Sequence, residues 1–244
     1  MTRLQIHQLD SGYRGQAVIH NINLQIESGQ IAGLIGLNGA GKSTLLKTIL
    51  GLIKPIKGEL HLDGYSVLED QAAYASKIAY VPETPILYEE LTLKEHLEMT
   101  ALGYGIPFEV VMERAQPLLE LFRLDKHLNW LPIHFSKGMK QKVMIICAFV
   151  IDADLLIIDE PFLGLDPLAI NHLTRLMKEA AAAGKAIIFT THVLAIADQL
   201  CDQFLFLQQG RLVGSGSLSQ VQDQMGLPGA DLETLYLKMT EGQI

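Results

Sequence analysis

The alternation of apolar and polar residues predicts strands in the first part of the chain. Residues 4–9, LQIHQL, and 21–26, NINLQI, alternate as strands with one buried face do. Residues 31–37, IAGLIGL, form a continuous apolar run that suits a strand buried on both faces. A glycine-rich loop follows, then LLKTILGL, with helical spacing up to Gly51. KGELHLDG, residues 57–64, predicts a further short pair of strands.

The pattern becomes helical in the middle of the chain. TLKE, residues 92–95, is a capping box at the start of LKEHLEMTALGY. FEVVMERA and LLELFRL continue the helical spacing, which Pro117 should interrupt or kink. The apolar run VMIICAFVI comes next. We predict that residues 86–150 form a helical subdomain inserted into a core made of residues 1–85 and 151–244.

Strands and helices then alternate to the end of the chain. LLIID and AIIFTTH have strand patterns, and they alternate with the helical patterns AINHLTRLMKEAAAAG and VLAIADQLCD. QFLFLQQGRLVGSG predicts a closing hairpin, and two short helices are expected around SLSQVQDQM and ADLETLYLKM. This rhythm predicts an α/β fold with a mainly parallel sheet, an N-terminal antiparallel β portion and the inserted α-helical subdomain.

Composition narrows the class of protein. A chain of 244 residues with 49% hydrophobic residues can fill a sizeable core, which makes disorder unexpected. A formal charge of −8 argues against broad, sequence-independent binding of nucleic acid. Cys147 and Cys201 lie far apart, which suits buried thiols in a reducing compartment. No apolar run approaches the ~20 residues that span a bilayer, and the N-terminus lacks a signal-peptide pattern. We expect a cytosolic protein that reaches a membrane only through a partner.

The most specific motif is GLNGAGKS, residues 36–43, which satisfies G-x-x-x-x-G-K-[ST] between an apolar strand and a helix. Backbone N–H groups of such a loop wrap a phosphate chain, the lysine reaches the terminal phosphates and the serine hydroxyl binds Mg²⁺. An ordinary glycine-rich turn is the less favoured alternative, because strand, loop, lysine and helix agree. The expected nucleotide-binding residues are Gly36, Asn38, Gly39, Ala40, Gly41, Lys42, Ser43 and Thr44.

A second group of polar residues follows two later apolar strands. Asp159 ends LLIID and is expected to hold Mg²⁺, and Glu160 is a candidate to polarise the attacking water. His192 follows AIIFTT, so it should emerge at the same edge of the sheet, where ligands of open α/β sheets bind. Two solvated carboxylates are the alternative, which the phosphate loop disfavours.

FSKGMKQK, residues 135–142, breaks the usual rules for a helix start. Ser136 predicts an N-cap, yet three lysines follow at the positive end of the helix, at a cost of roughly 0.3 to 1 kcal/mol each. Gly138 in the first turn costs about 1 kcal/mol relative to alanine. Such penalties are expected where an anion docks. Because the chain has its own phosphate loop, we predict that Ser136 and Gly138 bind the nucleotide of another molecule.

Five motifs in this order resemble the ATP-binding subunits of ABC-type transporters. These motifs are GLNGAGKST (Walker A), FSKGMKQ (the signature segment), LLIIDEP (Walker B), LGLD ending at Asp166, and TH at residues 191–192. YVPETPILYEELTLKEHLEMTA and HFSKGMKQKVMIICAF are most similar to Ecs-type bacterial ABC ATPases. The resemblance covers essentially the whole chain. It implies a RecA-like P-loop NTPase core, ATP and Mg²⁺ as ligands, and ATP hydrolysis.

The resemblance also implies partners and further site residues. It implies that Tyr13 stacks on adenine, that Asp166 helps to join two subunits, and that Glu83 meets Mg²⁺ along with Ser43 and Asp159. It implies a homodimer with ATP at the interface, held at the inner face of the membrane by a multi-span permease of the Ecs type.

Two departures from the family pattern concern the site. The usual LSGGQ is FSKGM here, with Lys137 at the first glycine and Met139 at the glutamine. Glu83 stands where many relatives carry glutamine, and an ionised carboxylate accepts but does not donate hydrogen bonds.

The function expected from these features is the energising of a transporter, in the exporting direction. The alternative is a non-transport ABC ATPase acting on nucleic acid or the translation machinery, but the chain has one cassette and no sustained heptad run. A P-loop kinase for small molecules leaves FSKGMKQ and LGLD unexplained. No nucleic acid is expected as a partner.

Overall fold

A six-stranded sheet forms the centre of the computed structural model, which describes residues 2–241. Its strand order is β10-β9-β3-β8-β7-β6, and all neighbours are parallel except the β9–β10 hairpin, which is antiparallel. The prediction of a mainly parallel sheet is therefore confirmed. The strands are β3 (Ile31–Ile35), β6 (Ile78–Val81), β7 (Leu155–Ile158), β8 (Ala186–Thr190), β9 (Gln203–Gln208) and β10 (Arg211–Gly216).

The predicted antiparallel portion is a second, four-stranded sheet of order β2-β1-β4-β5. Its strands are β1 (Thr2–Tyr13), β2 (Gln16–Glu27), β4 (Lys57–Leu62) and β5 (Tyr65–Ser66). β4 lies within KGELHLDG, but its partner β5 follows just after that segment, so the strand pair expected there extends past residue 64. Both residues of their turn, Asp63 and Gly64, have positive φ. This backbone suits a tight two-residue hairpin.

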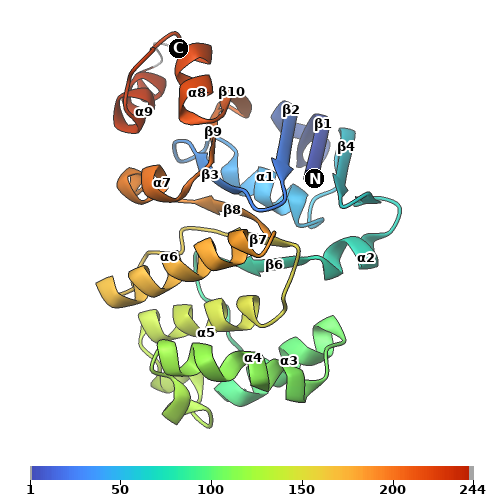
Figure 1. Ribbon diagram of the computed structural model, residues 1–244. Helices are drawn as coiled ribbons and strands as arrows, with labels where there is room; N and C mark the ends of the chain where they lie inside the picture. The colour runs from blue at the N-terminus through green and yellow to red at the C-terminus, as the bar shows by residue number, and fades with distance from the viewer. Residues whose placement is uncertain (1, 242–244) are drawn as a thin grey trace.

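Both faces of the central sheet are buried, as its apolar runs predicted. Along β7, Leu156 and Ile158 join one hydrophobic cluster and Leu155 and Ile157 join another, since side chains alternate across a strand. The first cluster packs against α3 (Leu93–Tyr104), α4 (Phe108–Leu121), α5 (Lys137–Phe149) and α6 (Pro167–Ala182). The second packs against α1 (Lys42–Ile49) and the antiparallel sheet. The central sheet thus lies between a helical layer and a β layer (Figure 1).

The helices agree with the sequence patterns at most positions. Thr92 and Glu95 form the expected capping box at the start of α3. α4 runs through Pro117 without interruption, so of the two outcomes expected there, an interruption or a kink, the interruption is wrong. The sequence patterns did not predict α2 (Gln71–Ser76) or β6. The remaining helical elements are α7 (Leu194–Leu200), α8 (Leu218–Gln224), α9 (Leu232–Thr240), and the short 3₁₀ turns η1 (Asp125–His127) and η2 (Pro132–His134).

The connection between α4 and α5 carries an aromatic cluster around Trp130. The Trp130 ring lies 4.3 Å from the His127 ring, edge to face, and 6.2 Å from Phe135 in a stacked arrangement. Phe135 is buried and directly precedes the N-cap of α5.

Across residues 2–241, no helix is both long enough and apolar enough to cross a membrane.

Candidate functional site

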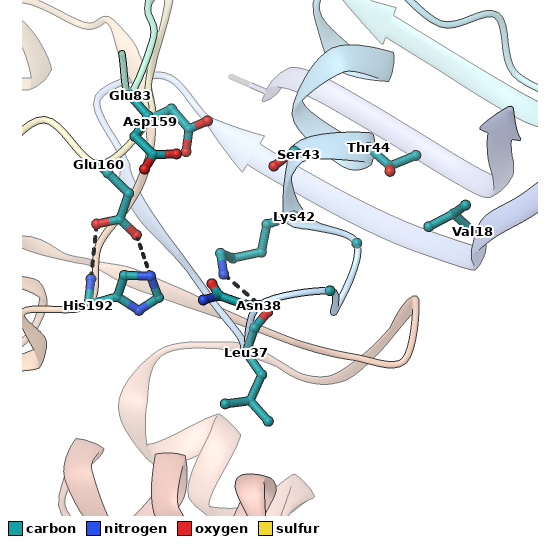
Figure 2. A pocket seen from close by; sticks show the side chains of 12 residues that line it. Val18, Leu37, Asn38, Lys42, Ser43, Thr44, Glu83, Asp159, Glu160 and His192 are labelled. Atoms are coloured by element: carbon teal, nitrogen blue, oxygen red, sulfur yellow. Dashed lines mark hydrogen bonds and ion pairs between the residues drawn. The ribbon is translucent and has the colours of Figure 1, made fainter.

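The predicted phosphate loop and acidic residues line one cavity of about 320 Å³ at the carboxyl ends of β3, β7 and β8 (Figure 2). Parallel strands bring these ends to the same edge of a sheet, where ligands of open α/β folds bind. The cavity is lined by Val18, Leu37, Asn38, Gly39, Gly41, Lys42, Ser43, Thr44, Glu83, Asp159, Glu160 and His192.

The phosphate loop connects β3 directly to α1. Gly41 caps the helix with φ 107°, a conformation that side chains disfavour, and an added Cβ would lie 2.9 Å from Ile19. Because Gly41 has no side chain to cap α1, the first backbone N–H groups of this helix are available to a phosphate chain bound within the loop. Within the loop, Gly36 and Ala40 are buried and do not line the cavity.

The Lys42 side chain bonds back to its own loop. Its Nζ donates hydrogen bonds to the carbonyl oxygens of Gly36 at 2.7 Å and Leu37 at 3.2 Å. Burial lowers the pKa of the Lys42 ammonium, although Glu160, Asp159 and Glu83 act in the opposite direction. An arriving phosphate would add negative charge beside this partly desolvated cation and favour its charged form.

Asp159 and Glu160 follow β7, and both form a hydrogen bond with Thr190 of β8. The hydroxyl of Thr190, the last residue of β8, donates to Asp159 Oδ1 at 2.6 Å and accepts from the backbone N–H of Glu160 at 2.8 Å. The backbone N–H of Asp159 donates to the carbonyl of Val81 at the end of β6. Both carboxylates are therefore placed by neighbouring strands of the central sheet.

Glu160 is buried against His192. Its Oε2 accepts the backbone N–H of His192 at 3.2 Å, and its Oε1 lies 3.2 Å from His192 Nε2. Apart from that ion-pair distance, Oε1 is buried with no hydrogen-bond partner. Burial raises the pKa of Glu160, whereas His192 and Lys42 lower it and Asp159 raises it further. A carboxylate with a raised pKa is the stronger base once it is ionised.

The oxygen atoms in the cavity fit a hard divalent cation. Ser43, Glu83 and Asp159 all line it, and Figure 2 labels the three side chains. Within residues 2–241, no three acidic, histidine or cysteine side chains gather closely enough to hold a metal ion alone. Mg²⁺ is typically bound by one or two carboxylates together with substrate phosphates and water, which matches this donor set.

The signature residues lie outside the cavity. Ser136 is the N-cap of α5, as predicted, and its hydroxyl accepts from the backbone N–H of Met139 at 3.2 Å. A Cβ at Gly138 would lie 2.5 Å from the carbonyl oxygen of Gly164, so this glycine also permits close packing within its own chain.

Two of the three lysines at the start of α5 have partners within the chain. Lys140 pairs with Glu89 at 3.3 Å, and Lys142 pairs with Asp166 at 2.8 Å. The hydrogen bond from Lys142 lowers the pKa of Asp166. Tertiary ion pairs thus offset part of the cost of placing cations at a helix N-terminus.

Sequence reasoning missed three residues of the site. Val18 and Leu37 line the cavity, and Thr190 joins the two acidic residues. A hydroxyl at the end of the otherwise apolar run AIIFT was the signal available for Thr190. Tyr13, predicted to stack on adenine, is 47% exposed beside the β1–β2 turn and does not line the cavity.

Comparisons with known proteins agree with this geometry. Residues 19–163 match the family model described as ABC transporter. The ABC-type transporter ATP-binding protein EcsA of Bacillus subtilis is 51% identical over 241 residues, which cover 99% of this chain and 98% of that protein.

Solved structures give the same result. A structure described as the ATP binding subunit of an ABC transporter superposes with a TM-score of 0.93 at 47% identity, covering 98% of this chain and 99% of that one. A dimeric ATP-binding cassette in a post-hydrolysis state, bound to ADP and Pi, superposes with a TM-score of 0.78 at 25% identity, covering 88% and 98%. The chain described here therefore belongs to the ABC transporter family, as an ATP-binding subunit that hydrolyses ATP.

Proposed function

We propose that this chain dimerises around two molecules of ATP·Mg²⁺ and energises a separate multi-span permease, as an exporter of the Ecs type. The observation that carries the proposal is the single cavity that joins a phosphate loop to Asp159, Glu160 and His192. The 51% identity to EcsA supports the Ecs-type assignment. The exporting direction rests on the resemblance of the motifs.

The chain's own groups are suited to bind the nucleotide. The loop N–H groups at the start of α1 surround the phosphates, and Lys42 exchanges its two carbonyl partners for phosphate oxygens. Ser43, Asp159 and Glu83 would hold Mg²⁺, which neutralises charge on the phosphate oxygens when bound. Tyr13 is exposed and lies outside the cavity, on the strand that pairs with the strand of Val18, and Val18 lines the cavity; stacking of Tyr13 on adenine is proposed from this proximity of the two strands.

Glu160 carries the proton chemistry in this proposal, and His192 positions it. Glu160 polarises a water molecule and accepts one of its protons as the water oxygen bonds to the γ-phosphorus, while the bond from that phosphorus to the β–γ bridging oxygen breaks; the proton is then released with the products. The products are ADP and phosphate. His192 contacts both oxygens of Glu160: its backbone N–H donates to Oε2, and its Nε2 lies 3.2 Å from Oε1, so His192 fixes the direction of the carboxylate.

The signature segment completes the site of a second chain. Ser136 and Gly138 lie outside their own chain's cavity, at the N-terminus of a helix whose dipole favours an anion. In a head-to-tail homodimer they would face the terminal phosphate bound by the partner, and Asp166 would lie at the same interface. The similar cassette that is dimeric and bound to ADP and Pi supports a dimer that holds nucleotide.

A charge change at Ser136 tests the composite site. In a Glu160→Gln background, which slows hydrolysis, ATP·Mg²⁺ should shift the protein to dimer in sizing or light scattering. Ser136→Asp should prevent that shift, because aspartate caps a helix as well as serine but repels the phosphate. Ser136→Asn is the matched control, with the same size and capping ability and no charge. Equal dimerisation of the Asp and Asn variants would exclude Ser136 from the phosphate site. Gly138→Asp is less informative, because its Cβ would strike Gly164 in the same chain.

A membrane partner distinguishes this proposal from a non-transport ABC ATPase. Several apolar side chains are well exposed, including Leu52 at 70%, Ile86 at 71% and Leu102 at 78%, and they offer contacts for a permease. We propose that residues 86–150 pass the motion of the dimer to that permease and that the protein is peripheral at the inner face of the membrane. Co-purification of a multi-span protein from detergent-solubilised membranes is the expected result. Recovery with ribosomes or nucleic acid and no membrane protein would favour the alternative.

A further inference from the structure

Thr190 makes two hydrogen bonds that serve both acidic residues of the site. It is the last residue of β8, which lies between β3 and β7, and its side chain is fully buried. Its hydroxyl accepts from the backbone N–H of Glu160 at 2.8 Å and donates to Asp159 Oδ1 at 2.6 Å. The backbone N–H can only donate, so the single hydroxyl proton is available for the carboxylate. The two bonds are therefore compatible and their directions are fixed.

The bond to Asp159 sets the orientation of that carboxylate. Its Oδ1 is engaged by Thr190 while the backbone of Asp159 is held by Val81 at the end of β6. The main chain and one carboxylate oxygen are therefore both fixed, which limits the directions open to the side chain of Asp159 where it lines the cavity. Such partners behind a metal-binding carboxylate fix its direction and are costly to remove.

The bond to Glu160 holds an unusual backbone conformation. Glu160 has φ 46°, in the left-handed region that residues other than glycine rarely adopt. Its N–H points to Thr190, and its carboxylate reaches the backbone N–H of His192. Strained backbone of this kind persists only where surrounding contacts hold it, and it is often found at functional sites.

We propose that Thr190 is a positioning residue for ATP hydrolysis, in which one buried hydroxyl aligns Asp159 toward the metal and Glu160 toward the attacking water. This inference rests on the roles proposed above for Asp159 and Glu160. A merely structural hydroxyl would support the end of β8 and leave metal affinity and turnover unchanged.

Two substitutions separate the hydroxyl from the shape of the side chain. Thr190→Val keeps the shape and removes both hydrogen bonds, whereas Thr190→Ser keeps the hydroxyl and removes a methyl group. The first readout is Mn²⁺ affinity with a non-hydrolysable ATP analogue, measured by electron paramagnetic resonance. The second is kcat and KM for ATP with Mg²⁺.

We expect Thr190→Val to weaken Mn²⁺ binding and to lower kcat by about 10- to 100-fold each, the usual range for a group behind a metal ligand. Affinity for the analogue without metal should be unchanged, because Lys42 and its loop are not altered. Thr190→Ser should restore both quantities to near the wild-type values. If Thr190→Val does not fold, Thr190→Cys decides, because a thiol of similar size is a weaker donor and should give intermediate losses.

The Glu160→Gln variant separates failure of this inference from failure of the proposed function. Wild-type Mn²⁺ affinity and turnover in Thr190→Val, with Glu160→Gln inactive, would overturn the role of Thr190 and leave that of Glu160 intact. Wild-type turnover in Glu160→Gln would overturn both roles. Equal losses in Thr190→Val and Thr190→Ser would also overturn the inference, because the methyl group and not the hydroxyl would then matter.

Discussion

Gly138→Ala tests the close contact between α5 and the loop that follows Glu160. The new methyl group would lie 2.5 Å from the carbonyl oxygen of Gly164, a backbone atom that cannot rotate away. Helix propensity favours alanine over glycine by about 1 kcal/mol, whereas overpacking typically costs about 1–3 kcal/mol. The expected net effect is a loss of up to about 2 kcal/mol in the free energy of unfolding. Turnover should also fall, because Gly164 lies only four residues after Glu160 in the same loop.

Gly103→Ala provides the matched control for this prediction. Gly103 also lies in a helix, α3, but an added Cβ there would meet no atom within 4 Å. That substitution should stabilise the protein by about 0.4–1 kcal/mol. Urea unfolding measures both changes, and in thermal unfolding each kcal/mol corresponds to about 2–4 °C for a chain of this size. If Gly138→Ala stabilises the protein as much as Gly103→Ala does, the contact with Gly164 does not constrain the helix.

Three further predictions follow from the structure: two concern the nucleotide site, and one concerns a surface ion pair. Lys42→Ala should abolish tight ATP binding or turnover, and near wild-type activity of the purified variant would remove Lys42 from the phosphate site. Glu83→Gln should retain most basal ATP hydrolysis while altering the stimulation of hydrolysis by the membrane partner, whereas Glu160→Gln should lose basal hydrolysis. If Glu83→Gln loses as much basal hydrolysis as Glu160→Gln does, the proton chemistry belongs to Glu83. The hydrogen bond from Lys185 lowers the pKa of Asp152 in the folded protein. The ion pair therefore stabilises the fold at pH values above the pKa of Asp152 in the unfolded chain, about 3.9. This stabilisation is lost as the pH falls through the lower pKa of the folded protein. Asp152→Asn should therefore lower the free energy of unfolding by under about 1 kcal/mol at pH 7 and leave it unchanged at a pH below both pKa values. Urea unfolding at the two pH values measures this difference. An equal loss at both would contradict the ion-pair explanation.

Local patterns predicted the elements whose signals are long or specific. The capping box of α3, the continuous apolar strands and the loop before Lys42 all depend on neighbouring residues, and the structure has them as expected. α2 was missed because a helix of six residues is too short to show a period. β6 is as short as β7, but β7 is an unbroken run of Leu and Ile that ends at two acidic residues, and β6, IAYV, has neither mark.

The features of the site that the sequence did not predict depend on contacts between segments far apart in the chain. Gly138 packs on Gly164, 26 residues later, and the hydroxyl of Thr190 reaches Glu160, 30 residues earlier. Lys140 and Lys142 look unfavourable at a helix N-terminus until their carboxylate partners are placed beside them. Pairings of this kind are set by how the sheet and helices pack, so no window of neighbouring residues contains them.

The aromatic cluster before α5 gives this protein a built-in fluorophore. Trp130 is the single tryptophan of the chain, and it is 42% exposed, stacked on Phe135 at the base of the signature segment. Its emission therefore comes from one place, and a change in its solvent contact would alter wavelength and intensity. Stopped-flow mixing with ATP can follow the start of α5 in real time without a label. Movement of the signature segment can then be timed separately from the release of phosphate.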